Sequence, residues 1–310
     1  MICHFEFLFL IFEFDMEIKE QKIKNYLSTE FIGSEIHIFE RVESTNDTAK
    51  ELAVNGCKEG TVIIADSQSK GRGRQERRWE SPAGVGIYLS IVVKPKKIMP
   101  QLTLVAGVSA AEAIMKIVNS NPFASLLMER ATPPSPPLQR EGEGEVSLKW
   151  PNDININGKK AGGILTEGVE NGKAIIVGIG INVNTPTPIP IGVGGEGFPD
   201  ELKDKATSIM IETGRRIDRN ILIAEILNRF EFCYKKFIIE EKETVMKRWR
   251  ELSDTSGRRV KVNVGDSVFE GVALGLDNDG SLMIRLDDGF LKKVSAGEIF
   301  YCKNLSSHFR

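Results

Sequence analysis

A chain of 310 residues with 41% hydrophobic and 27% charged residues has the composition of a soluble globular protein, and it is long enough for one sizeable domain and a smaller one. Its net charge of −2, from 41 basic and 43 acidic residues, argues against a general nucleic-acid-binding surface. Four widely spaced cysteines fit reduced thiols, and with only three histidines the chain offers neither a zinc-ligand pattern nor a histidine triad.

The first 15 residues are apolar and aromatic but are interrupted by Glu6 and Glu13. They lack a basic segment and a cleavage site, and they are too short to span a bilayer, so a membrane anchor is the less favoured interpretation. We expect residues 1–35 to be an extension with one short polar helix over 17–29. This length leaves no room for a winged-helix DNA-binding domain.

From residue 36 the sequence alternates between strand and helix patterns. β-branched and alternating apolar runs predict strands, and apolar stripes at helical spacing predict helices. The predicted strands cover residues 37–42, 61–66 and 85–94, and the predicted helices cover 48–55 and 102–119. The polar residues 43–47 are N-cap candidates for the first of these helices.

A basic loop over residues 68–81 connects the second and third of these strands. It holds five cationic side chains and two glycines, and it has no helical or strand period. Guanidinium groups bind phosphate or carboxylate with two hydrogen bonds, and backbone N–H groups at glycine can approach an anion closely. The loop is a candidate anion clamp; a solvated basic turn is the alternative.

Two segments rich in proline and glycine follow, over residues 131–145 and 185–199. They cannot bury a core, so we expect surface insertions, the first of them disordered. Between them, Asn157-Gly158 predicts a hairpin turn, and consecutive hairpins indicate an antiparallel or mixed sheet. The predicted strands cover 146–150, 153–156, 159–167 and 173–183, and two helices follow over 219–237 and about 240–252.

The last part of the chain carries five short strand patterns between residues 259 and 301, most of them separated by Gly- and Asp-containing turns. This pattern predicts a small closed barrel of about 50 residues. We expect it to serve mostly stability, with some contact role.

Two motifs place polar side chains at the ends of predicted elements. Ser44, Thr45 and Asn46 offer hydroxyl and amide groups at a helix start, which suits a neutral polar ligand but also an ordinary cap. Lys149 ends a strand beside a turn fixed by Pro151, which is a rigid position for a catalytic cation. A surface lysine before a turn is the alternative.

A glycine series over residues 178–182 stands in a predicted strand. It fails as a dinucleotide-binding fingerprint, because Val183 occupies the third glycine position and a proline-rich segment follows. Alternate glycines flatten one face of a strand, so a ligand can lie against the backbone there. No P-loop motif occurs in the sequence.

Five segments, taken in chain order, resemble the motifs of the biotin protein ligases. They are Glu43-Ser44-Thr45-Asn46, Gly71-Arg72-Gly73-Arg74 with Trp79 and Ser81-Pro82, Lys149-Trp150-Pro151-Asn152-Asp153, Ala161-Gly162-Gly163-Ile164-Leu165 and Gly178-Ile179-Gly180-Ile181-Asn182. Each is weak alone, whereas the ordered set is specific, and the resemblance covers about residues 36–301. It is to the form of the family without the N-terminal DNA-binding domain.

The resemblance implies an α+β fold. A catalytic domain over residues 36–253, with a mixed sheet like that of class II aminoacyl-tRNA synthetases and biotin–lipoate ligases, follows the extension over 1–35. A small SH3-like β-barrel over 257–303 completes the chain. The implied reaction has two steps: biotin and ATP give biotinoyl-5′-AMP, and biotin is then transferred to a lysine of a biotin carboxyl carrier protein.

The resemblance also implies roles for residues of each motif. The catalytic cations are Lys149, Arg74 and Arg72. Biotin is expected to contact Ser44, Thr45, Asn46, Gln68, Arg72, Gly73, Arg74, Lys149, Gly162, Gly163 and Gly180. The nucleotide is expected to contact Arg74, Trp79, Lys149, Asn152, Gly178 and Asn182, with a core position as the alternative for Trp79. Mg²⁺ is expected to be carried by ATP, and the basic loop to close over the adenylate as a lid.

The expected partner is the carrier subunit of acetyl-CoA carboxylase or a related carboxylase, and the expected compartment is the cytoplasm. No nucleic-acid or membrane partner is expected, and a homodimer is left open. A lipoate–protein ligase of the same fold is the nearest rival. A DNA-binding regulator and an inactive carrier-binding module are less favoured, because no helix-turn-helix pattern occurs and every expected cation is present.

Overall fold

The computed structural model describes residues 17–97, 99–120, 145–169, 173–186, 202, 205–239 and 242–302. The apolar first 15 residues of the predicted extension over 1–35 lie outside the described residues. The two predicted insertions, over 131–145 and 185–199, lie almost entirely outside them as well.

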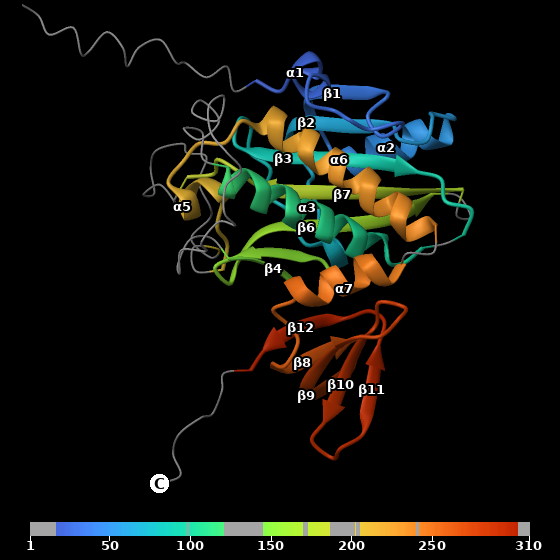
Figure 1. The fold of residues 1–310 in the computed structure, drawn as a ribbon, viewed down its shortest axis with the longest axis vertical. Helices are drawn as coiled ribbons and strands as arrows, with labels where there is room; N and C mark the ends of the chain where they lie inside the picture. Colours follow the sequence, from blue (N-terminus) through green and yellow to red (C-terminus); the bar gives the residue numbers. More distant parts are fainter. Residues whose placement is uncertain are drawn as a thin grey trace, which may run out of the picture.

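A seven-stranded mixed sheet forms the centre of the larger domain (Figure 1). Its strands are β1 (Ile36–Val42), β2 (Val62–Gln68), β3 (Gly86–Val93), β4 (Val146–Lys149), β5 (Asp153–Ile156), β6 (Lys159–Val169) and β7 (Ala174–Asn182). They lie in the order β1-β2-β3-β7-β6-β5-β4, with β1 and β2 parallel and the other neighbours antiparallel. The predicted mixed sheet is confirmed, and Asn157 and Gly158 both have positive φ at the predicted hairpin turn.

Helices cover both faces of this sheet (Figure 1). The main core lies under α3 (Leu102–Asn119), α6 (Arg219–Ile238) and α7 (Lys242–Leu252). A smaller core lies under α2 (Thr45–Val54) on the other face. The alternation of side chains along β3 divides its residues between the two cores. Leu89 and Ile91 lie in the main core, whereas Val92 lies in the smaller one, as the predicted alternation requires.

Of the described helices, α3 alone is long and apolar enough to cross a bilayer by length and composition. It is 61% buried, and the core helix of a globular protein passes the same test.

Three short elements differ from the sequence prediction. Helix α2 begins at Thr45, three residues earlier than expected, because the Thr48 N–H already donates to the Ser44 carbonyl at 3.1 Å. Helix α5 (Ile209–Thr213) was not predicted, since five residues are too few to show an apolar stripe. Within the predicted polar helix over 17–29, the structure has only α1 (Glu20–Lys24).

The C-terminal region is a five-stranded antiparallel sheet. Its strands are β8 (Arg259–Val264), β9 (Ser267–Leu276), β10 (Leu282–Leu286), β11 (Leu291–Val294) and β12 (Glu298–Tyr301), in the order β11-β10-β9-β8-β12. The two outermost strands do not pair, so the predicted closed barrel is wrong in this respect. A Cβ on Gly297 would lie 2.8 Å from the Asn263 carbonyl oxygen, so the chain approaches β8 closely just before β12 pairs with it.

Candidate functional site

A cavity of about 380 Å³ lies at the N-terminal end of α2 and reaches the C-terminal sheet. Its lining includes residues of all five sequence motifs, together with Gly297, Glu298 and Ile299 of the C-terminal region. Every residue that the sequence assigned to biotin or nucleotide lines this cavity, with the exception of Gly162. The fold therefore brings together segments that lie more than a hundred residues apart.

Gly162 lies on the opposite side of β6 from Gly163. A Cβ on Gly162 would lie 3.0 Å from the carbonyl oxygen of Gly180 and 3.3 Å from the Ile154 side chain. The absence of a side chain at Gly162 thus allows β6 to pack closely against β7 and Ile154.

Trp79 lies across Gly163 and Gly180, which pair with each other in β6 and β7. A Cβ on Gly180 would lie 2.8 Å from Nε1 of Trp79, and one on Gly163 would lie 3.6 Å from its Cζ3. Gly180 therefore makes room for the indole on β7, whereas a Cβ on Gly163 would make only an ordinary van der Waals contact with it. The Nε1 of Trp79 is buried and donates to no acceptor within the part of the chain that the structure describes.

A polar cluster surrounds the first turn of α2. The backbone N–H of Thr45 donates to Oε1 of Gln68 at 2.9 Å, and Nε2 of Gln68 donates to Oγ of Ser81 at 2.9 Å. Because a backbone N–H can only donate, this pair fixes which end of the Gln68 amide faces α2. Ser44 lines the cavity beside it, and its side chain makes no cap hydrogen bond.

Arg72 lies in an arrangement of opposite charges. Its two terminal nitrogens each donate to one Asp47 carboxylate oxygen at 2.5 Å, and Nη2 also lies 3.3 Å from both Glu167 oxygens. The hydrogen bonds from Arg72 hold the pKa of Asp47 below its ordinary value of 3.8, and those same bonds raise the pKa of Arg72. The positive charge of Arg72 is therefore already compensated.

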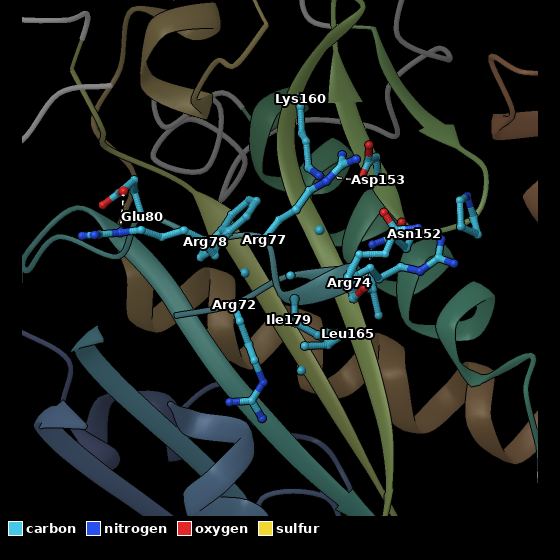
Figure 2. Close-up of a pocket in the computed structure, with 18 of the residues that line it drawn as sticks. Arg72, Arg74, Arg77, Arg78, Glu80, Asn152, Asp153, Lys160, Leu165 and Ile179 are labelled. Carbon is cyan, nitrogen blue, oxygen red and sulfur yellow. Dashed lines mark hydrogen bonds and ion pairs between the residues drawn. The ribbon is translucent and has the colours of Figure 1, made fainter. Parts of the chain in front are cut away.

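Arg74 and Lys149 have different surroundings from Arg72. Nη1 of Arg74 donates to the Gly297 carbonyl at 3.0 Å, and burial lowers the pKa of this guanidinium. The Nζ of Lys149 lies 4.8 Å from the centre of the Tyr301 ring. Among the described residues neither cation has a carboxylate partner. Figure 2 shows Arg74 beside Asn152, with Arg72 pointing away from both. Arg74 and Lys149 are thus cations of the cavity that can act on an added anion, and Lys205 of the lining likewise has no carboxylate partner among the described residues.

Three of the predicted nucleotide contacts also hold the protein together. Nδ2 of Asn152 donates to the Ile164 carbonyl at 2.9 Å, and Nδ2 of Asn182 donates to the Thr207 carbonyl at 3.0 Å. A Cβ on Gly178 would overlap the Asn46 amide. These contacts leave the ligand roles of the three residues as predictions.

Sequence reasoning did not single out several residues of the site. Lys160 pairs with Asp153 at 2.6 Å, and its Nζ lies 5.6 Å from the centre of the Trp79 ring (Figure 2). Arg77 of the basic loop forms a two-bonded ion pair with Glu298 of β12. Asp153 belongs to the motif over residues 149–153, so the sequence could have indicated its place in the site. The ion pair of Arg77 with Glu298 joins residues 221 positions apart, and no sequence motif indicated it.

No group of three His, Cys, Asp or Glu side chains that could hold a metal ion occurs among the described residues. The cavity carboxylates Asp153 and Glu298 are each paired with a cation, as is Glu80, which pairs with Arg78 at 2.7 Å. The donor set of the described site is therefore that of an anion-binding cavity.

Two family models match the chain. Residues 38–184 match the biotin/lipoate A/B protein ligase family, and residues 255–301 match the biotin protein ligase C-terminal domain. The first match covers the seven-stranded sheet except for the first two residues of β1, and the second covers the C-terminal strands.

Known proteins agree with these matches. The bifunctional ligase/repressor BirA of Bacillus subtilis is 34% identical over 290 residues, which cover 91% of this chain and 79% of that protein. The biotin–[acetyl-CoA-carboxylase] ligase of Mycobacterium tuberculosis is 27% identical, over 87% of this chain and 90% of that protein. The structure of the Aquifex aeolicus biotin protein ligase in complex with biotin and ATP is 30% identical, with a TM-score of 0.69 over 87% of this chain and 100% of that chain. The chain belongs to the biotin protein ligase family.

Proposed function

We infer that the chain activates biotin with ATP and then transfers the biotinoyl group to a lysine of a protein. The observation that carries this inference is the cavity itself, where residues of all five motifs meet around Arg74 and Lys149, which have no carboxylate partner in the described chain. The relatives whose names include biotin ligation, and the structure with biotin and ATP, support it.

The chemistry of the first step requires fixed positive charge. The biotin carboxylate attacks the α-phosphorus of ATP, the bond from that phosphorus to the bridging oxygen breaks, and pyrophosphate leaves. Two anions meet in this step, so Arg74 and Lys149 lower the barrier by stabilising the negative charge on the phosphate oxygens. We propose that Mg²⁺ enters with ATP, bound to the phosphates as part of the substrate.

The second step needs a protected intermediate. The lysine ε-amine attacks the carbonyl carbon of the mixed anhydride, and AMP leaves with the electron pair of the broken bond. Water would attack the same carbon, so the site has to exclude it. We propose that the basic loop serves as the lid, since it reaches across the cavity and binds the C-terminal sheet through Arg74 and Arg77.

The ligand contacts follow from the lining of the cavity. We propose that Ser44, Thr45, Asn46 and Gln68 hold the polar head of biotin. The buried Nε1 of Trp79 needs an acceptor, and we propose that the nucleotide lies against this indole beside Asn152 and Asn182.

The proposed acceptor is the carrier subunit of acetyl-CoA carboxylase, as the name of the Mycobacterium tuberculosis relative suggests. We place the reaction in the cytoplasm, a compartment that suits cysteines without a disulfide, as Cys57, Cys233 and Cys302 are in the described part of the chain. Measurement of the molecular mass in solution, with and without biotin and ATP, tests whether the chain forms a homodimer.

The test of the proposed function is incubation with ATP, Mg²⁺, biotin and a biotin carboxyl carrier protein. We expect biotin on one lysine of the carrier, detected by mass spectrometry after proteolysis. A carrier whose acceptor lysine is replaced by arginine serves as the control and should stay unmodified. An unmodified wild-type carrier, with an enzyme that is folded by circular dichroism, would contradict the proposal.

A further inference from the structure

Glu167 of β6 connects two parts of the site that the motifs treat separately. Its Oε2 accepts a hydrogen bond from Nδ2 of Asn46 at 2.6 Å, and its Oε1 accepts one from Nζ of Lys50 at 2.6 Å. Both oxygens also lie 3.3 Å from Nη2 of Arg72. One carboxylate thus contacts a residue proposed to hold biotin and the compensated arginine of the basic loop.

The carboxylate is well shielded, because only 23% of its side-chain surface is exposed. Burial alone would raise the pKa of Glu167, but hydrogen bonds from Lys50 and Asn46 and the charge of Arg72 outweigh it and hold this pKa below its ordinary value of 4.5. At neutral pH Glu167 is therefore an anion that can only accept hydrogen bonds.

An acceptor at this point fixes the orientation of the Asn46 amide. Nδ2 has to face Glu167, so Oδ1 faces Ser90, whose hydroxyl donates to it at 2.6 Å. The Ser90 and Thr45 hydroxyls are 2.9 Å apart, and Thr45 in turn contacts Gln68. The donor and acceptor pattern that a ligand meets at α2 is thereby set, in part, from Glu167.

A glutamine at this position could not serve all the same partners. Lys50 and Arg72 carry only donors, and Nδ2 of Asn46 is a donor too, whereas a glutamine amide has a single oxygen. If that oxygen faces Lys50, the amide nitrogen faces Asn46, donor against donor. Asn46 then has to lose its partner or turn over, and turning over would place Oδ1 near the Leu165 carbonyl, to which Nδ2 now donates at 3.2 Å.

We propose that Glu167 is a positioning residue for biotin recognition, which acts by fixing the orientation of the Asn46 amide. This inference rests on the proposed function of the chain as a biotin ligase. It assigns to β6 a role in selectivity for the ligand head, separate from the glycines of the same strand.

The test is steady-state kinetics of adenylate formation by the full chain with Glu167→Gln. We expect the KM for biotin to rise about tenfold, which is the effect of leaving one buried polar group without its partner. The KM for ATP should stay close to the wild-type value, whereas the Tm should fall, because the change also removes the negative charge that Lys50 and Arg72 face. A merely structural role would raise both KM values together, and that result would overturn the proposal.

A double-mutant cycle separates the route through Asn46 from a general charge effect. In the Asn46→Ala background, Glu167→Gln should change the KM for biotin by less than about twofold, because the group it positions is gone. Lys50→Met serves as the matched control: it removes the cation on the other oxygen and leaves the acceptor of Asn46 in place, so the KM for biotin should change little. A full tenfold effect in the Asn46→Ala background, or an equal effect of Lys50→Met, would overturn the proposal.

Failure of the proposed function is distinguishable from failure of this inference. Wild-type enzyme that forms no biotinoyl-AMP removes the function, whereas an active wild type with an unaltered Glu167→Gln variant removes only the role of Glu167.

Discussion

Two arginines that are two positions apart in the basic loop have opposite electrostatic surroundings. Arg72 is 19% exposed and bound by two carboxylates, whereas Arg74 donates to a single carbonyl and has no carboxylate partner in the described chain. The sequence motif treats them alike. We propose that Arg72 orders the loop against α2 and that Arg74 supplies charge to the cavity.

Lys149 should contribute strongly to the first chemical step. Lys149→Ala is expected to slow biotinoyl-AMP formation on the order of 10²–10³-fold, by analogy with the loss of one preorganised donor at a developing anion. Single-turnover quench experiments measure this rate. Lys159→Ala, at an exposed lysine of β6 outside the cavity lining, is the matched control and should behave as wild type. A normal rate in Lys149→Ala would remove that lysine from the chemistry.

The pair of Asp47 and Arg72 should make stability depend on pH in the acid range. The pKa of Asp47 is lowered in the folded protein, so its contribution is fully present above the ordinary value of 3.8 and is lost as the pH falls through the folded value. Asp47→Asn should therefore lower the Tm at pH 7. The loss in the free energy of unfolding should be below about 1 kcal/mol, because 42% of the Asp47 side chain is exposed.

The difference in Tm between wild type and Asp47→Asn should narrow once the pH drops below 3.8. Differential scanning calorimetry from pH 7 downward measures it. Asp266→Asn, at an exposed position without a described ion pair, is the control and should show no such trend. A difference that stays constant down to the acid transition would contradict the assignment.

At the level of elements, the basic loop makes contacts with the C-terminal sheet. Arg77 is paired with Glu298, and Arg74 donates to Gly297, the residue before it. The 297–299 segment thereby forms part of the cavity wall, so the C-terminal sheet does more than add stability. We expect it to hold the proposed lid.

Glu298→Gln should weaken this hold and let biotinoyl-AMP leave sooner. Since Arg77 is 61% exposed, the pair is worth about 0.2–1 kcal/mol, and the release rate should rise by no more than about fivefold. Release of the labelled adenylate from the enzyme on a spin column measures the rate. Asp287→Asn breaks an exposed ion pair of the same sheet, with Arg259, that lies away from the loop, and it should leave release unchanged. Equal release rates in the wild type, Glu298→Gln and Asp287→Asn would contradict the proposed role of the loop as a lid.

Periodicity predicted the regular elements well. Helix α3 has the predicted bounds, 102–119, because its stripe is long and unbroken. The sequence also predicted most of the cavity residues, since most of the motifs stand at or near an element end. It could not predict that Gly178 makes room for Asn46 or that Arg77 binds Glu298, because such contacts depend on how distant segments pack. The unpaired outer strands of the C-terminal sheet were missed for the same reason.

For the molecule as a whole, we propose that one cavity serves both steps of a biotin ligation. Helix α2, the basic loop, the turn after β4, the strands β6 and β7 and the C-terminal sheet all contribute to it. A lipoate ligase of the same fold would use the same adenylation chemistry. We therefore propose that selectivity depends on the polar cluster at α2, whose donors and acceptors suit a ureido head better than an apolar ring.

The most direct measurement of this central claim is adenylate formation with α-labelled ATP and either biotin or lipoate, separated by thin-layer chromatography. We expect labelled biotinoyl-AMP with biotin, and no labelled lipoyl-AMP above background with lipoate. Labelled adenylate with lipoate and none with biotin would contradict it.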